Sequence, residues 1–152
     1  MISSLLLAIG LLSVAIMPAV PASACGVPCP PCGPGTGTPG YWKNHPEAWL
    51  VDEITIGGVT YTKAQAISIM QTSVRGDKTY TMFNALVAAK LNGACEHIKG
   101  TIAAADAWMA EWGPVGNGVG AGGEDSPWRT GESLYEQLDE YNNGELCAPP
   151  RD

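Results

Sequence analysis

The sequence predicts a mainly α-helical fold: a small helical bundle with one short β-hairpin and an extended Pro/Gly/Cys-rich N-terminal arm, stapled by disulfides. Three observations lead to this prediction. Apolar residues recur at spacings of three and four in several segments after Thr62, which is the period of an amphipathic helix. A Gly-Gly pair separates two short β-branched runs, as in a hairpin. Five cysteines in a chain of 152 residues are enough for two disulfides.

Residues 1–24 form an uncharged apolar segment that predicts export. Residues 2–20 are ISSLLLAIGLLSVAIMPAV, and Ala22 and Ala24 make an A-x-A cleavage pattern before Cys25. We interpret the segment as a secretory signal peptide, although no Lys or Arg precedes its apolar core. Because about 20 apolar residues can span a bilayer, a retained membrane anchor is the alternative. Both interpretations place the folded part outside the cytoplasm, so the expected location is extracellular or at the cell surface.

Residues 25–40 are predicted to be an extended arm. They consist almost entirely of Gly, Pro, Cys and Thr, and no charged side chain occurs before Lys43. Such a composition favours neither a helix nor a packed core. The helical domain is therefore expected to span residues 41–152, which is enough chain for one modest core.

The first elements of this domain follow from local signals. A helix start is expected at Pro46, and two β-branched runs over residues 54–62 flank the Gly-Gly pair of the hairpin. Thr62 is a suitable cap for a helix that continues to Ser73. Arg75-Gly76-Asp77 then indicates a turn.

Three longer helices complete the prediction. They are expected over residues 79–92, 96–111 and 132–141, with Gly93 ending the first and an Asn-Asn-Gly sequence ending the last. The apolar residues expected to face the core from the helices after Thr62 are Ala66, Ile67, Met70, Met82, Phe83, Leu86, Ala89, Ile98, Ile102, Ala105, Met109, Trp112, Leu134, Tyr135, Leu138 and Tyr141.

The five cysteines predict disulfides, because an exported chain folds in an oxidising compartment. The run Cys29-Pro30-Pro31-Cys32 favours polyproline II, in which three residues advance about 9 Å. A local disulfide needs a Cα separation of roughly 4.4–6.8 Å, so a bridge within this run is disfavoured. We therefore expect Cys29 and Cys32 to pair with Cys95 and Cys147. Cys25 remains for lipidation or for a bond between molecules.

Metal and redox alternatives to these disulfides are less favoured. Zinc could be bound by Cys29, Cys32, Cys95 and His97, but disulfides are the commoner use of cysteine in exported proteins. A C-x-x-C redox centre normally stands between a strand and a helix, a context that the arm lacks. Acids on the last predicted helix could bind calcium, although no ordered ligand loop accompanies Glu132, Glu136, Asp139 and Glu140. We expect neither a metal site nor a cofactor.

The densest aromatic cluster is GYWKNHPEAW at residues 40–49. Aromatic faces can stack on sugar rings, so Tyr41, Trp42, His45 and Trp49 are candidate binding residues. Aromatic residues beside a helix start are more often core anchors, and this is the favoured interpretation. His45 is expected to cap a helix or to hydrogen-bond, because no second catalytic group stands at a recognisable spacing from it.

Three segments together resemble a known family. The run TPGYWKNHPEAW, the following GGVTYTKAQ segment and the late LDEYNNG segment are similar to an extracellular domain of unknown function that recurs in exported and surface-attached microbial proteins. The resemblance covers roughly residues 38–144. It implies export and a surface location, and it supplies no catalytic residues.

Charge and two short motifs exclude further function classes. The net charge of −7 argues against nucleic acid as a partner, because phosphate binding needs a basic face. Residues 118–123 match the dinucleotide motif G-x-G-x-x-G, but a helix end precedes them and two acids follow, so we interpret them as a loop. Arg75-Gly76-Asp77 occurs in some adhesion ligands, yet a turn between helices explains it.

The sequence favours a non-enzymatic role, because it contains no readable Ser-His-Asp set, metal-ligand spacing or phosphate loop. The leading hypothesis is an exported structural module, a subunit of an extracellular fibre or cell-surface layer that associates with itself through the arm. The arm would add to an edge or groove of a neighbour, and the hairpin at residues 54–62 offers one edge. The alternatives are a surface-anchored domain that binds polysaccharide through Tyr41, Trp42 and Trp49 and, more weakly, an exported hydrolase. Membrane contact is expected only through residues 1–24 or a lipid on Cys25.

Overall fold

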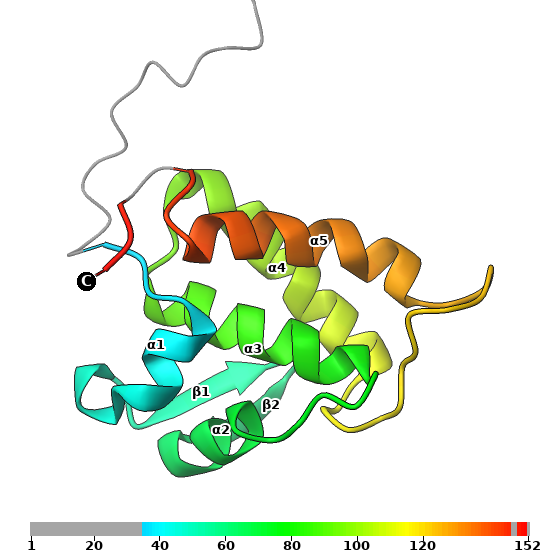
Figure 1. Cartoon of the computed structure of the whole chain (residues 1–152), viewed down its shortest axis with the longest axis horizontal. Helices are drawn as coiled ribbons and strands as arrows, with labels where there is room; N and C mark the ends of the chain where they lie inside the picture. The colour runs from blue at the N-terminus through cyan, green and yellow to red at the C-terminus, as the bar shows by residue number, and fades with distance from the viewer. Residues whose placement is uncertain (1–34, 147–148, 152) are drawn as a thin grey trace, which may run out of the picture.

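The computed structural model describes residues 35–146 and 149–151, and in these ranges the fold is mainly helical with a two-stranded antiparallel hairpin (Figure 1). The elements are, in chain order, α1 (Pro39–Asn44), the 3-10 helix η1 (Pro46–Ala48), β1 (Glu53–Ile56), β2 (Val59–Thr62), α2 (Lys63–Met70), α3 (Lys78–Leu91), α4 (Glu96–Trp112) and α5 (Trp128–Asn142). The predicted mainly α class with one hairpin is confirmed for this part of the chain. Among the described helices, none combines the length and apolar character that crossing a membrane requires.

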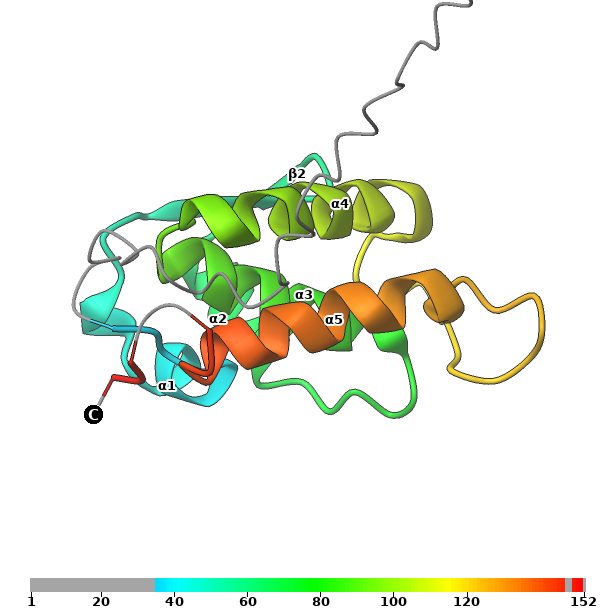
Figure 2. The ribbon, with the colours of Figure 1, turned by 90° about the horizontal axis from the view of Figure 1, so that it is seen from above.

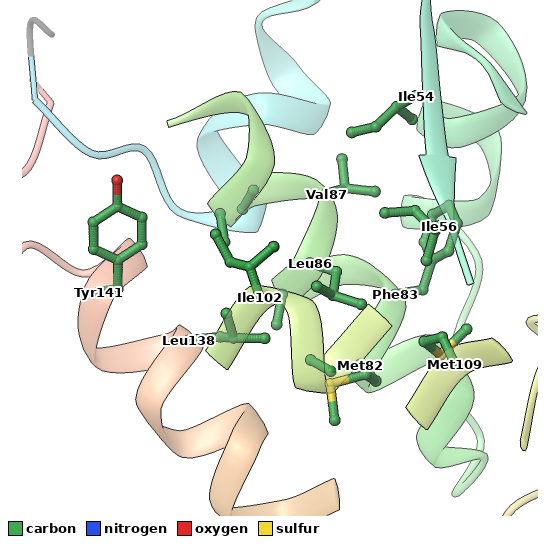
Figure 3. Packing of buried hydrophobic residues seen from close by; sticks show 14 of the residues in the cluster. Ile54, Ile56, Met82, Phe83, Leu86, Val87, Ile102, Met109, Leu138 and Tyr141 are labelled. Carbon is green, nitrogen blue, oxygen red and sulfur yellow. The ribbon is translucent and has the colours of Figure 1, made fainter. Parts of the chain in front are cut away.

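Helix α3 lies at the centre of the molecule. It packs against α4 and α5 on one side and against α1, α2 and β1 on the other (Figure 1). Figure 3 shows its side chains between Ile56 of β1 and Leu138 of α5. Because neighbours cover it on both sides, the helix is apolar over most of its circumference instead of along one stripe. Its buried residues are Thr79, Met82, Phe83, Ala85, Leu86, Val87, Ala88 and Ala89.

The hairpin is joined to α2 by the predicted cap. Thr62 Oγ1 accepts a hydrogen bond from Gln65 N–H at 3.3 Å, and Gln65 Oε1 accepts one from Thr62 N–H at 2.8 Å, which forms a capping box. Helix α2 ends at Met70, before the expected Ser73, because residues 71–73 are exposed and gain no core contact. Both residues of the Gly57-Gly58 turn have positive φ, 57° and 79°, as a two-residue hairpin turn requires.

Helix α5 begins at Trp128, earlier than the predicted start at Glu132. Ser126 Oγ accepts a hydrogen bond from Trp128 N–H at 3.2 Å and caps the additional turn. Gly131 weakens the helical signal in the sequence, but in the fold it is buried against Trp108 of α4. A Cβ on Gly131 would lie 2.8 Å from Trp108 Cε2, so close helix packing requires glycine at this position.

The folded body begins before Tyr41, where the predicted arm ended. Helix α1 starts at Pro39, and Thr38 Oγ1 accepts a hydrogen bond from Tyr41 N–H at 3.1 Å. Thr36 is only 1% exposed. The body therefore starts earlier than predicted: Pro39 and Gly40 are helical, because a Thr cap followed by Pro starts a helix even within a Pro/Gly-rich segment, whereas residues 35–37 are extended as predicted but buried. Residues 1–34, which include the predicted signal peptide and the rest of the arm, lie outside the described residues.

Candidate functional site

The two ends of the described chain lie side by side at one end of the bundle, opposite the loop between α4 and α5 (Figure 2). Thr36 N–H donates to Pro149 O at 2.9 Å, and Arg151 N–H donates to Thr36 O at 2.7 Å, which makes a parallel β-bridge between Thr36 and Pro150. Arg151 Nε also donates to Gly35 O at 2.8 Å. The chain that leads into the predicted arm is thus bound to the C-terminal segment on the surface of the body.

Asn92, the residue after α3, binds Gly37, which follows Thr36 in the chain. Its Oδ1 accepts a hydrogen bond from Gly37 N–H at 2.6 Å and its Nδ2 donates to Gly37 O at 3.0 Å, so the side-chain amide pairs with Gly37 as a neighbouring strand would. Oδ1 also accepts from Trp42 Nε1 at 2.9 Å, and Nδ2 also donates to Asn142 Oδ1 at 2.9 Å. Asn142 Nδ2 donates in turn to Ala85 O at 3.0 Å. All four hydrogen-bonding positions of this buried amide are therefore occupied.

Residues 35–37, residues 149–151 and Asn92 together form what we call the arm anchor. Two glycines are required there by their surroundings. A Cβ on Gly37 would lie 2.6 Å from Tyr41 Cδ1, and Gly35 has a φ of 112° that side chains rarely adopt. The glycines at the junction of arm and body therefore serve close packing and not only flexibility.

Trp42 and Trp49 belong to the core. They are 2% and 4% exposed, and Trp49 Nε1 donates to Trp42 O at 2.9 Å. The guanidinium of Arg151 lies 4.7 Å from the centroid of the Trp42 ring and covers it from the anchor side. The candidate sugar-stacking surface is therefore wrong for both tryptophans, because neither ring has a free face, and the structure agrees with the interpretation as core anchors.

Tyr41 and His45 are more accessible, but they stack on each other. Their ring centroids are 4.5 Å apart with an interplanar angle of 27°. His45 is the C-cap of α1, and its Nδ1 lies 2.8 Å from Glu47 Oε1. A hydrogen bond from its own backbone and the bond to His45 lower the pKa of Glu47. These contacts give His45 the capping and hydrogen-bonding role that the sequence suggests.

Cys95 stands at the N-terminal cap of α4 and is disulfide-bonded. Its Sγ lies 3.7 Å from Tyr141 Oη, next to the Asn142 of the Asn92 network. The other four cysteines, Cys25, Cys29, Cys32 and Cys147, all lie outside the described residues, so the structure does not identify its partner. The pairing of Cys29 and Cys32 with Cys95 and Cys147, and the role of Cys25, therefore stay predictions.

Arg75-Gly76-Asp77 forms a turn whose carboxylate is used within the protein. Asp77 Oδ1 accepts a hydrogen bond from Thr79 N–H at 2.9 Å and caps α3, while Oδ2 accepts one from Gly118 N–H at 2.9 Å. Burial alone would raise the pKa of Asp77, but hydrogen bonds from Thr79, Gly118 and Val119 lower it overall. These contacts tie the predicted glycine-rich loop to the start of α3, and they give no support to an adhesion role.

Two further observations concern the described residues as possible ligands or reaction centres. In the described part of the chain, no group of three or more His, Cys, Asp or Glu side chains could hold a metal ion. Each of four surface grooves on these residues is lined by at most one carboxylate. No family model, no curated protein and no solved structure matches this chain.

The residues of the arm anchor were not identified by the sequence. Asn92 and Asn142 resemble ordinary helix ends there, since Asn is common at such positions. Their bonds join residues 50 or more positions apart, which no local pattern reveals. The one available signal is that Thr38-Pro39 is a cap followed by a first-turn proline, which places the start of the body before Tyr41.

Proposed function

We propose that the chain is an exported structural module, a subunit of an extracellular fibre or cell-surface layer that assembles through its N-terminal arm. The observation that carries the proposal is the arm anchor. Two backbone hydrogen bonds hold Thr36, and the buried side-chain amide of Asn92 makes two hydrogen bonds with the backbone of Gly37. A simple tether needs no such fixation. An arm that binds a neighbour benefits from it, because a fixed root leaves less conformational freedom to be lost on docking.

The composition of the arm also suits association. Residues 25–34 are CGVPCPPCGP, without any charged side chain. Proline-rich segments are already extended, so they lose little entropy when they bind. An uncharged segment also avoids the large cost of removing charges from water in an interface.

The two alternative functions receive less support. Binding of polysaccharide was based on Tyr41, Trp42 and Trp49, and burial removes the two tryptophans from such a surface. A hydrolase of the carboxylate type needs two carboxyl groups facing one cleft. None of the four grooves described above is lined by two carboxylates.

The size of the exported protein as a function of concentration tests the proposal. Sedimentation velocity is expected to show oligomers whose proportion rises with concentration, and electron microscopy is expected to show fibres or sheets. Val27→Asp places a charge in the arm and is expected to reduce assembly. Val59→Asp is the matched control, since Val59 is a 42% exposed valine on the hairpin. A wild-type chain that stays monomeric at every concentration would overturn the proposal.

A further inference from the structure

A groove of about 470 Å³ lies between the loop before β1 and the C-terminal end of α3. Its apolar lining comes from Leu50, Val51, Ile54 and Leu91. Leu50 is 98% exposed and Val51 is 43% exposed. Adjacent exposed aliphatic side chains around a depression are typical of a binding surface, whereas scattered ones are ordinary. We call these four residues the acceptor groove.

The main-chain groups beside the groove differ along the chain. Those near the turn of β1 are covered by hydrogen-bonded side chains, whereas those at residues 50–51 are not. Lys90 Nζ donates to Thr55 O at 2.6 Å and to Asp106 Oδ2 at 2.9 Å, and Asp106 Oδ1 accepts from Gly57 N–H at 2.8 Å. These contacts cover the outer edge of β1 toward its turn. Within the described ranges, no hydrogen bond is made to the backbone of Leu50 or Val51. An extended peptide can therefore pair with main-chain groups at residues 50–51 while its side chains enter the groove.

We propose that the acceptor groove binds the start of the arm, residues 25–28, of a second copy of this chain, since Cys29 and Cys32 are expected to be bonded to Cys95 and Cys147 of their own copy. The inference rests on the proposed function and identifies the surface that receives the arm. The occupant matches the site in chemistry: residues 25–28 have no charged side chain, and Val27 and Pro28 present apolar surface to the aliphatic residues of the lining. Glu53, Thr55 and Lys90 complete the lining, and Lys90 already binds Thr55 O and Asp106, so the aliphatic part of the groove suits an uncharged segment.

A second copy suits the groove better than the arm of the same copy. In Figure 1 the arm anchor lies above α1, and the loop before β1 lies below this helix. Gly35 is bound to Arg151 on the anchor side. If Cys29 and Cys32 bond to Cys95 and Cys147 as expected, the arm of the same copy is held on the anchor side, away from its own groove. Because the arm and the groove are different surfaces, copies that bind head to tail leave one arm and one groove free at the ends, so the contact can continue into a fibre.

A complementation experiment on the full-length chain tests the inference. Leu50→Lys and Val51→Lys place a charge in the groove, and each is expected to weaken assembly at least roughly tenfold in the concentration required. Val59→Lys is the control, because Val59 matches Val51 in type and in exposure, 42% against 43%, and lies outside the groove. Thermal unfolding of the variants is expected to match that of the wild type, since Leu50 is exposed already.

The mixture of two variants gives the decisive result. Val27→Asp has an impaired arm and an intact groove, and Leu50→Lys has the reverse, so each alone is expected to be monomeric. Mixed in equal amounts, they are expected to form pairs that contain one copy of each and grow no further. If the mixture stays monomeric, or if both groove variants assemble like the wild type, the groove does not receive the arm. If both groove variants assemble like the wild type but Val27→Asp still disrupts assembly, the arm is needed and the proposed function stands. A monomeric wild type overturns both.

Discussion

Replacing Asn92 with alanine tests the arm anchor most directly. Asn92→Ala leaves four buried groups without their partner: the N–H and C=O of Gly37, Nε1–H of Trp42 and Oδ1 of Asn142. An unsatisfied buried group costs about 1–3 kcal/mol, and such costs are less than additive in one network. We therefore expect a loss of about 4 kcal/mol in the free energy of unfolding. This is a large part of the roughly 5–15 kcal/mol that stabilises a typical domain.

Urea unfolding followed by tryptophan fluorescence measures this loss. With a urea dependence of about 2 kcal/mol per molar, the midpoint is expected to fall by roughly 2 M. Asn117→Ala is the control, because Asn117 is exposed and its side chain makes one bond, to Trp112 O at 2.9 Å; its effect is expected to stay within about 0.5 kcal/mol. Amide hydrogen exchange at Gly37 is expected to accelerate in Asn92→Ala. A loss below about 1 kcal/mol would refute the assignment of Asn92 as the centre of the anchor.

Three further predictions concern the same structure. Gly37→Ala is expected to lower the free energy of unfolding by about 2 kcal/mol through steric conflict. Gly100→Ala, in open space on α4, is the control and is expected to raise it by about 0.5–1 kcal/mol. Equal effects of the two substitutions in thermal unfolding would contradict the close packing at Gly37. Because the pKa of Asp77 is lowered in the folded state, its contribution to stability is complete above about pH 4 and is lost as the pH falls through the folded pKa. Asp77→Asn is expected to flatten the stability profile below about pH 4 in urea unfolding, and an unchanged profile would exclude this contribution. Arg151→Ala is expected to speed hydrogen exchange of the Thr36 amide by roughly tenfold, since it removes the bond to Gly35 beside the bridge; unchanged exchange would show that the bridge does not depend on this side chain.

Helices whose signals are local could be predicted closely from the sequence. The Thr62–Gln65 capping box and the apolar spacing of α4 depend only on neighbouring residues, so the starts of α2 and α4 agree with the prediction. The start of α5 could not be predicted in the same way. Its first turn contains Gly131, a residue that weakens an isolated helix, and only the indole of Trp108 on another helix explains it.

The candidate site depends on contacts that the sequence does not encode locally. The sequence singles out the segment around Trp42 and favours core positions for its aromatic residues, but it leaves a binding surface open, because both favour aromatic residues. Burial against Asn92 and Arg151 decides that question, and both of these residues are far from Trp42 in the chain. The acceptor groove has the same origin: Leu50 becomes notable only because β1 and α3 bring Ile54 and Leu91 beside it.

The parallel bridge between Thr36 and Pro150 also determines how the domain would respond to tension. If a pull on the arm were resisted at the C-terminal segment, the force would cross from residue 35 to residue 151 through this bridge, and it would not pass through the bundle. The two strands run in parallel and would be pulled from opposite ends, so their hydrogen bonds would be sheared together instead of opening one after another. The helical core would remain unloaded until the bridge failed. In the proposed assembly the neighbour's arm holds the acceptor groove instead, so the load would pass from residue 35 through the body, and the bonds of Asn92 to Gly37 would carry part of it.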